Sequence, residues 1–211
     1  MKAGRLHDIS QRLRAELPVW PGDVPVTVDV TAAVSAGSSV TLHRLTVSTQ
    51  AGTHAECSRH VRDDAPALDE LALSAFVGEC EVRDVRAARQ TVTAADVLDR
   101  LPAKVERVLL RTLGQSDWER WPADFTALAP ELIDALAARG CRLIGTDAPS
   151  IDPQTCTALR SHHAAHRAGM AILEGLVLDA IPEGRYELIA LPLPIAGIEA
   201  TPVRAVLREF G

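Results

Sequence analysis

Aromatic residues and long apolar segments are scarce in this chain of 211 residues. Phe, Trp and Tyr together make up 3% of it, and only three tryptophans are present. No apolar segment approaches the roughly 20 residues that a membrane-spanning helix needs, and the first residues lack the apolar stretch of a signal peptide. We therefore expect a cytoplasmic protein without a membrane partner.

Positive charge is also in short supply. Lys and Arg total 22 against 28 Asp and Glu, the formal net charge is -6, and no long basic cluster is present. A surface that follows a nucleic-acid backbone needs such clusters, so we expect no nucleic-acid partner. The hydrophobic fraction of 47% is too high for a disordered chain and is sufficient for a buried core.

The four cysteines do not have the spacing of a redox or zinc motif, because none forms a C-x-x-C pair. Without an export signal, a disulfide framework is not expected. Cys57 differs from the others because it lies between Glu56 and His60. A thiolate there would be a good zinc ligand, but on an extended chain its side chain points away from that of His54. The sequence leaves both possibilities open.

Short strands and helices alternate along the chain. Strands are predicted at 6–9, 26–30, 40–49, 78–85, 107–112, 143–146, 171–178, 187–193 and 203–208, and helices at 68–76, from Thr93, at 130–139 and from Asp152 to Arg167. No repeat, linker or change of composition marks a domain boundary. The pattern predicts one α/β domain over residues 1–211, with a mixed, barrel-like sheet flanked by helices.

The segment from residue 54 to 60 has the pattern H-x-E-x-x-x-H. On an extended chain, the side chains of His54 and Glu56 share one face. An imidazole and a carboxylate on one face suit a divalent metal ion. The alternative is a polar loop, since H-x-[DE] triplets also occur without a metal.

A second group of polar residues lies far along the chain. His162 and His166 are four residues apart and share one face of a predicted helix. Glu174 follows in the otherwise apolar segment A-I-L-E-G-L-V-L. A carboxylate in such a segment is costly unless it is paired or bound to a metal. Glu174 is therefore either a metal ligand or the partner of an arginine.

Several stretches of the chain, taken in order, resemble one known family. They are D-I-S at 8–10, V-W-P-G-D at 19–23, S-T-Q-A-G-T-H-A-E at 48–56, I-G-T-D-A-P-S-I-D-P at 144–153, the His pair at 162–163, A-I-L-E-G-L-V-L-D at 171–179, Y-E-L-I-A-L-P-L at 186–193 and T-P-V-R-A-V-L-R at 201–208. The chain resembles the bacterial kynurenine formamidase group of the cyclase superfamily of metal-dependent hydrolases. This resemblance implies a swivelling β/β/α fold, a homodimer, and zinc as cofactor with one or two ions.

The resemblance also implies roles for individual residues. His54, Glu56, His162 and Glu174 are expected to bind the metal, with Glu56 and Glu174 bridging two ions where two are present. His60 is expected to be the general acid and base. Its proton goes to the leaving aryl amine after water activated at the metal has attacked the formamide carbonyl.

The small-molecule substrate that the resemblance implies is an aryl formamide. Trp20 is expected to stack on its aromatic ring. The implied reaction converts N-formyl-L-kynurenine to L-kynurenine and formate. No G-x-S-x-G motif is present, which disfavours a serine nucleophile.

Three positions depart from the family pattern S-T-H-x-G-[TA]-H-x-D-x-P-x-H. Gln50 replaces its first His, Glu56 its Asp and Ser58 its Pro. The amide oxygen of Gln50 is a weaker zinc ligand than imidazole, and the carboxylate of Glu56 stands on a stem longer by one methylene. The departures favour one metal ion in place of two, or an oxygen-preferring ion such as manganese. Two other functions follow as alternatives: a related hydrolase of another aryl or cyclic amide such as isatin, and a metal-poor, non-catalytic relative.

Overall fold

The computed structural model describes residues 4–88, 90–116 and 118–211. Its strands are β1 (Leu6–Asp8), β2 (Thr27–Ala32), β3 (Leu42–Thr46), β4 (His54–Glu56), β5 (Val77–Asp84), β6 (Thr91–Val92), β7 (Arg107–Arg111), β8 (Ala127–Leu128), β9 (Leu143–Thr146), β10 (Ala171–Glu174), β11 (Gly184–Ile189), β12 (Ala200–Pro202) and β13 (Val206–Glu209). The α-helices are α1 (Ala94–Val97), α2 (Pro130–Ala138) and α3 (Arg160–Ala168), and the 3-10 helices are η1 (Val34–Ala36), η2 (Ser58–His60), η3 (Leu68–Glu70), η4 (Leu73–Ala75) and η5 (Leu98–Arg100).

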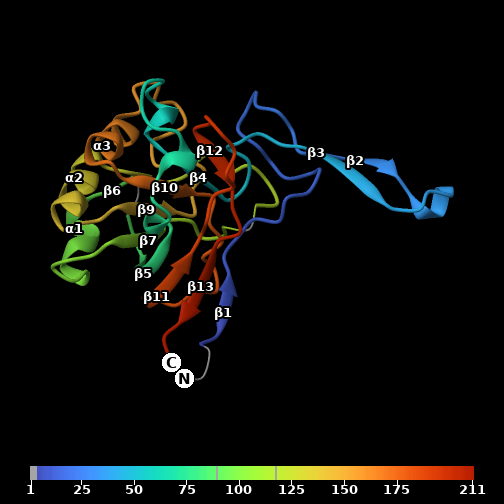
Figure 1. Cartoon of the computed structure of the whole chain (residues 1–211). Helices are drawn as coiled ribbons and strands as arrows, with labels where there is room; N and C mark the ends of the chain where they lie inside the picture. Colours follow the sequence, from blue (N-terminus) through green and yellow to red (C-terminus); the bar gives the residue numbers. More distant parts are fainter. Residues whose placement is uncertain (1–3, 89, 117) are drawn as a thin grey trace.

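Nine strands form one curled sheet in the order β1-β13-β11-β5-β7-β9-β10-β4-β12. The central strands β5, β7, β9 and β10 are parallel, and their neighbours on both sides are antiparallel. The three α-helices lie on one side of this sheet (Figure 1). The mixed, barrel-like sheet with flanking helices that the sequence predicts is confirmed, and strands from both ends of the chain join it, which supports a single domain.

The central parallel strands β7, β9 and β10 are almost entirely buried, which favours apolar residues on both faces. In β7, Val108 and Leu110 pack with the helices, whereas Leu109 between them packs in the core on the other face. Ile144 in β9 and Ile172 in β10 also face the helices. This two-residue alternation sets which side chains of the neighbouring strands point toward α3, and the candidate site lies on that side.

The hairpin of β2 and β3 projects away from the rest of the molecule (Figure 1). Its two strands pair only with each other in the described chain. Most of their residues are exposed. We refer to residues 27–46 as the arm. No helix among the described residues has the length and apolar character that would let it cross a bilayer.

Several of the predicted elements are wrong in extent. The helix predicted over 68–76 is split into η3 and η4, because Leu71 and Ala72 between them have extended backbones with ψ of 147° and 128°. The strand predicted over 171–178 ends at Glu174. Gly175 follows with a φ of +64°, and a Cβ at this position would lie 2.3 Å from the carbonyl oxygen of Gly52. Only glycine permits this conformation and this approach.

The helix predicted from Asp152 to Arg167 begins only at Arg160. Leu159 has a left-handed backbone with φ of 42°, so the helix cannot extend backward through it. Asp152 lies well before the helix in sequence, yet its carboxylate accepts hydrogen bonds from the backbone N–H groups of Ser161 and His162 at 3.0 Å. It therefore caps the first turn of α3.

Candidate metal centre

Two glycine backbones bring the His54 segment against β10. The close contact of Gly175 with Gly52 lies just beyond the antiparallel pairing of β4 with β10, in which His54 is directly opposite Glu174. Directly opposite residues in such a pair have Cβ atoms about 4.5–5.5 Å apart on the same face. Glu56 lies two residues further along β4, on the face that it shares with His54. Three of the predicted ligands are thus placed together by strand register alone.

The fourth predicted ligand comes from the helix above this face. In α3, Nε2 of His162 lies 3.1 Å from Oε1 of Glu56 and 3.5 Å from Oε1 of Glu174. Nε2 of His54 lies 3.4 Å from Oε2 of Glu174. Among the described residues, two groups have ligand atoms within 4.8 Å of one another: His54, Glu56 and Glu174, and Glu56, His60 and His162. The structure therefore brings together the four predicted ligands and His60, with Glu56 common to both groups.

Both buried imidazoles are oriented by a hydrogen bond on the nitrogen that faces away from the cluster. Nδ1 of His54 lies 3.0 Å from the carbonyl oxygen of Gly52, and Nδ1 of His162 lies 2.7 Å from Oδ2 of Asp152. Both oxygens are acceptors, so each Nδ1 donates its proton. In the neutral rings, each Nε2 then directs a lone pair into the cluster, as a metal ligand does.

Several buried atoms of the cluster make no hydrogen bond in the described part of the chain. Nε2 of His54 and both carboxylate oxygens of Glu56 contact only the other ionisable groups of the cluster. A carboxylate buried in this way is costly unless a positive charge compensates it. Imidazole nitrogens and carboxylate oxygens are the donors that zinc and manganese take. The residues present therefore fit a divalent metal ion.

The electrostatics of the cluster lead to the same conclusion. Burial lowers the pKa of both imidazoles, but the carboxylates outweigh it: Glu174 and Glu56 raise the pKa of His54, and Glu56 and Asp152, with Glu174, raise that of His162 well above its ordinary value. Burial raises the pKa of Glu174, yet its contacts with the two imidazoles lower it overall. The cluster thus favours positive charge, and a bound cation would displace these protons.

Asp152 is the residue of the centre that sequence reasoning missed as a functional residue. It is 2% exposed and contacts both the ring and the backbone of His162. Burial raises its pKa, but the hydrogen bonds from His162 and Ser161 lower it overall, so it is a carboxylate. The only signal in the sequence is the motif I-G-T-D-A-P-S-I-D-P, whose second Asp it is.

A cavity of about 300 Å³ adjoins the centre, and His60, His162 and Glu174 are among the residues that line it. All three tryptophans of the chain line it: Trp20 as predicted, and Trp118 and Trp121, which sequence reasoning missed. The ring centroids of Trp121 lie 5.5 Å from those of Trp20 and 5.7 Å from those of Trp118, both in edge-to-face contacts. Aromatic residues make up only 3% of the chain, yet three of them are tryptophans. This unusual share of tryptophan could have suggested that the three form one site.

The remaining polar residues of these segments lie outside the cluster or at its edge. Gln50 lines the cavity, and its Nε2 lies 3.2 Å from Nδ1 of His60. The thiol of Cys57 donates to the carbonyl oxygen of Pro66 at 3.4 Å and packs in the core, not with the predicted ligands. His163 is exposed and His166 is half-buried.

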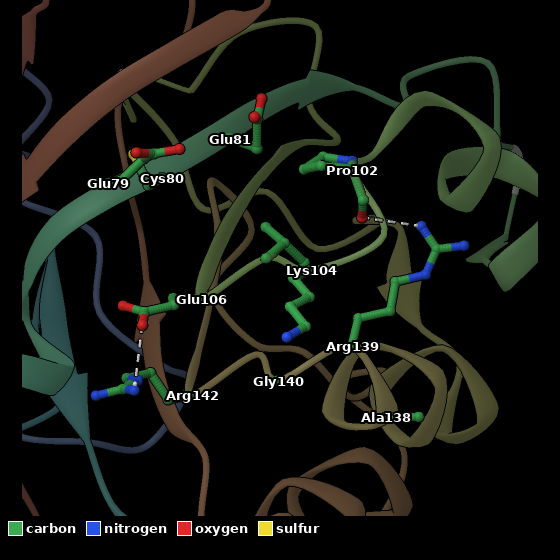
Figure 2. A pocket seen from close by; sticks show the side chains of 11 residues that line it. Glu79, Cys80, Glu81, Pro102, Lys104, Glu106, Ala138, Arg139, Gly140 and Arg142 are labelled. Atoms are coloured by element: carbon green, nitrogen blue, oxygen red, sulfur yellow. Dashed lines mark hydrogen bonds and ion pairs between the residues drawn. The ribbon is translucent and has the colours of Figure 1, made fainter.

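A larger cavity of about 730 Å³ lies at the amino ends of β7 and β9, far from this cluster. Figure 2 shows its charged side chains and marks two interactions among the residues drawn. Glu106 pairs with Arg142 at 3.2 Å, and Arg139 donates to the carbonyl oxygen of Pro102 at 3.3 Å. Glu79 pairs with Arg185 at 2.5 Å. Because none of these carboxylates is an unpaired buried group, the smaller cavity is the stronger candidate for chemistry.

Comparison with known proteins agrees with this geometry. The model of the Cyclase family matches residues 7–153, and the chain belongs to this family. It is 45% identical to the kynurenine formamidase of Sphingopyxis alaskensis over 206 residues, which cover 98% of this chain and 99% of that protein. The resemblance inferred from the sequence is thereby confirmed.

Two solved structures of the same fold are more distant in sequence. A protein from Bacillus stearothermophilus described as a predicted metal-dependent hydrolase has a TM-score of 0.84 at 26% identity, covering 97% of this chain and 98% of that chain. Isatin hydrolase A from Labrenzia aggregata has a TM-score of 0.81 at 26% identity, covering 96% of this chain and 93% of that chain.

Proposed function

We propose that this protein is a metal-dependent amidohydrolase that cleaves N-formyl-L-kynurenine to L-kynurenine and formate. One observation supports it above the others: two imidazoles and two carboxylates converge, with buried atoms that make no hydrogen bond among the described residues, beside a cavity lined by the three tryptophans. The identity of 45% with a kynurenine formamidase over nearly the whole chain supports this substrate over others.

The residues of the centre have distinct roles in this reaction. His54, Glu56, His162 and Glu174 are the metal ligands that we propose. A divalent ion bound there supplies Lewis-acid polarisation of the formyl carbonyl and of the attacking water. The site favours zinc or manganese, and the replacement of the family's first His by Gln50 favours one ion over two.

His60 is the general acid and base of the proposal. Its side chain is 31% exposed and lines the cavity beside the cluster, within reach of both water and a bound amide. It takes the proton of the attacking water and returns one to the aryl amine nitrogen as the C–N bond breaks. Formate and the free amine are the products, and no organic cofactor takes part.

The tryptophans bind the aromatic part of the substrate and exclude water. Trp20 offers an indole face for stacking, and Trp121 contacts it edge to face. The cavity of about 300 Å³ is at the lower end of the roughly 300–1,000 Å³ range of small-molecule sites. It suits a single-ring substrate better than a larger one.

The test of the proposed function is hydrolysis of N-formyl-L-kynurenine by protein prepared with zinc or manganese. We expect formate release that a chelator abolishes and that either ion restores. Preferential cleavage of isatin would favour the isatin hydrolase alternative. The 26% identity of this chain with isatin hydrolase A supports that alternative. Folded protein that binds neither ion would favour the non-catalytic relative. The cytoplasmic location stays a prediction.

We further propose a homodimer whose interface includes the arm. Val28 and Leu45 are directly opposite each other in the hairpin, and together with Val30 they make one face apolar, although each is at least 50% exposed. The other face carries the ion pair of Asp29 and Arg44 at 3.0 Å. An isolated two-stranded hairpin is marginally stable in water, so an exposed apolar face on one supports a partner surface, and a second copy is the commonest kind.

Val28→Lys is expected to weaken this dimer at least about 10-fold, because an unpaired ammonium would be buried in the interface. Thr27→Lys places the same charge on the adjacent exposed position and the opposite face, so it is the matched control. Sedimentation equilibrium over a range of concentrations measures both. A wild-type chain that stays monomeric throughout that range would refute the dimer.

A further inference from the structure

Asp23 lines the tryptophan cavity without belonging to the metal centre. The ionisable side chains among the described residues that line this cavity are His60, His162 and Glu174 at the centre, and Asp23. No lysine or arginine occurs among these lining residues. The cavity therefore offers a substrate one carboxylate away from the metal and no permanently positive side chain.

A tight turn fixes Asp23 relative to Trp20. The N–H of Asp23 donates to the carbonyl oxygen of Trp20 at 2.9 Å, and Gly22 between them has a φ of +92°. Proline at the second position and glycine with positive φ at the third are typical of a type II turn, whose first and last Cα atoms are less than about 7 Å apart. The carboxylate is thus held close to the indole that we propose to stack on the substrate ring.

The Asp23 carboxylate has unused capacity to accept hydrogen bonds. Its Oδ1 accepts from the N–H of Val24 at 2.6 Å, and its Oδ2 has no partner in the described part of the chain. A carboxylate can accept several hydrogen bonds on its two oxygens. The side chain is half-buried. It can therefore bind a positively charged donor in the cavity without giving up its bond to the turn.

We propose that Asp23 is a specificity-determining residue that binds the α-ammonium group of the substrate. This inference rests on the proposed function and narrows its substrate class to aryl formamides with a cationic side chain. N-formyl-L-kynurenine carries an ammonium and a carboxylate on a short chain attached to its ring. When the ring stacks on Trp20, the turn places Asp23 beside that chain. The substrate carboxylate meets no lysine or arginine of the cavity, so the ammonium is the charge that the protein recognises.

This contact contributes to binding and not to the chemical step. A hydrogen bond between two charged groups is stronger than a neutral one. The ammonium lies away from the formamide bond that breaks, so the contact is the same in the bound substrate and in the transition state. Its loss therefore raises KM and leaves kcat unchanged.

Four aryl formamides test the recognition with the wild-type, metal-loaded protein. They are N-formyl-L-kynurenine, its decarboxylated analogue, its deaminated analogue, and 2-formamidoacetophenone, which lacks both charged groups. We expect the decarboxylated analogue to have a KM within about threefold of that of N-formyl-L-kynurenine. The deaminated analogue is expected to have a KM at least about 10-fold higher, because it has lost the charged hydrogen bond.

Asp23→Asn tests the residue itself. Its amide oxygen can still accept from the N–H of Val24, so the turn is kept, but the negative charge is lost. We expect KM to rise about 10-fold for the two ammonium-bearing formamides at unchanged kcat, and to stay within about twofold for 2-formamidoacetophenone. Asp99→Asn, at an exposed position of η5 outside the cavity, makes the same change of charge and should alter neither value.

A binding measurement separates this proposal from the function on which it rests. Quenching of tryptophan fluorescence gives the affinity for L-kynurenine, which is expected to fall about 10-fold in Asp23→Asn, and for 2-aminoacetophenone, which is expected to stay the same. Equal KM values for N-formyl-L-kynurenine and its deaminated analogue in the wild type would overturn the recognition of the ammonium, even if Asp23→Asn does not fold. An unchanged affinity for L-kynurenine in folded Asp23→Asn would overturn the role of Asp23. Protein that shows the expected difference in affinity but cleaves none of the four formamides would refute the proposed function and leave the ammonium site standing.

Discussion

Glu174→Gln is expected to reduce the hydrolysis of N-formyl-L-kynurenine at least about 10³-fold and to abolish tight zinc binding. The substitution keeps the shape of the side chain. Its amide oxygen can still accept the hydrogen bond that Glu174 takes from the N–H of Ile151 at 2.7 Å. The new amide group would donate to Nε2 of His54, which lies 3.4 Å from Oε2 in the wild type. The substitution therefore both blocks the lone pair on Nε2 of His54 and removes the negative charge of Glu174.

The magnitude follows from what a bound ion contributes. Lewis-acid stabilisation is worth several kcal/mol of the barrier, and about 4 kcal/mol corresponds to 10³ in rate. Activity is measured by formate release and metal content by elemental analysis, with Glu131→Gln, an exposed acid in the first turn of α2, as control. Full activity with unaltered zinc content in Glu174→Gln would refute its role as a ligand.

The same variant also affects the metal-free protein. In the wild type, Nε2 of His54 and Nε2 of His162 lie 3.4 and 3.5 Å from the Glu174 carboxylate and lower its pKa, so the folded state favours its charged form. The substitution breaks these buried pairs. We therefore expect metal-free Glu174→Gln to melt below the metal-free wild type, and circular dichroism at the assay temperature is the control that separates lost chemistry from unfolding.

Much of the fold follows from local patterns in the sequence. The strand predicted over 143–146 coincides with β9, and the helix predicted over 130–139 corresponds to α2, because both have strong apolar patterns with clear ends at Thr146 and Gly140. Boundaries fail where a tertiary contact decides them. β10 ends at Gly175 because Gly52 packs against that backbone, and Gly52 is far away in sequence.

The candidate site could likewise be predicted only in part from the sequence. His54 and Glu56 could be placed together from the two-residue period of an extended chain, and Glu174 was conspicuous as a carboxylate in an apolar strand. Their common location, however, depends on the pairing of β4 with β10, which no local pattern specifies. The family resemblance supplied that link. The same resemblance does not explain Gln50, whose contact with His60 depends on this chain's own geometry.

Asp152 shows most clearly why part of the site could not be predicted. From the sequence, Asp152-Pro153 looks like the start of a helix. In the structure the carboxylate does cap a helix, but one that begins at Arg160, and the same oxygens orient the ring of His162. Both tasks depend on an intervening loop that returns the chain to α3. Asp152, which indicates a helix start in the sequence, therefore orients His162 in the candidate metal centre.

Asp152→Asn is accordingly expected to weaken zinc binding about 10–100-fold, the usual cost of losing a carboxylate that orients a metal-binding histidine. An Asn side chain has one acceptor oxygen, whereas Asp152 accepts from the N–H groups of Ser161 and His162 and from Nδ1 of His162. If the amide group turns toward Nδ1, it forces the proton onto Nε2 and blocks the metal-facing lone pair. If it turns toward Ser161, two donors face each other and the first turn of α3 loosens.

Competition titration of zinc against a chromophoric chelator measures the affinity, and thermal unfolding of the metal-free protein separates the two orientations. A loosened helix lowers the melting temperature, because an unsatisfied buried group costs about 1–3 kcal/mol of unfolding free energy. A turned imidazole leaves the melting temperature unchanged. Asp124→Asn, at an exposed position, controls for the change of charge. Unchanged zinc affinity in Asp152→Asn would mean that packing alone orients His162, because its ring would then keep its direction without the hydrogen bond.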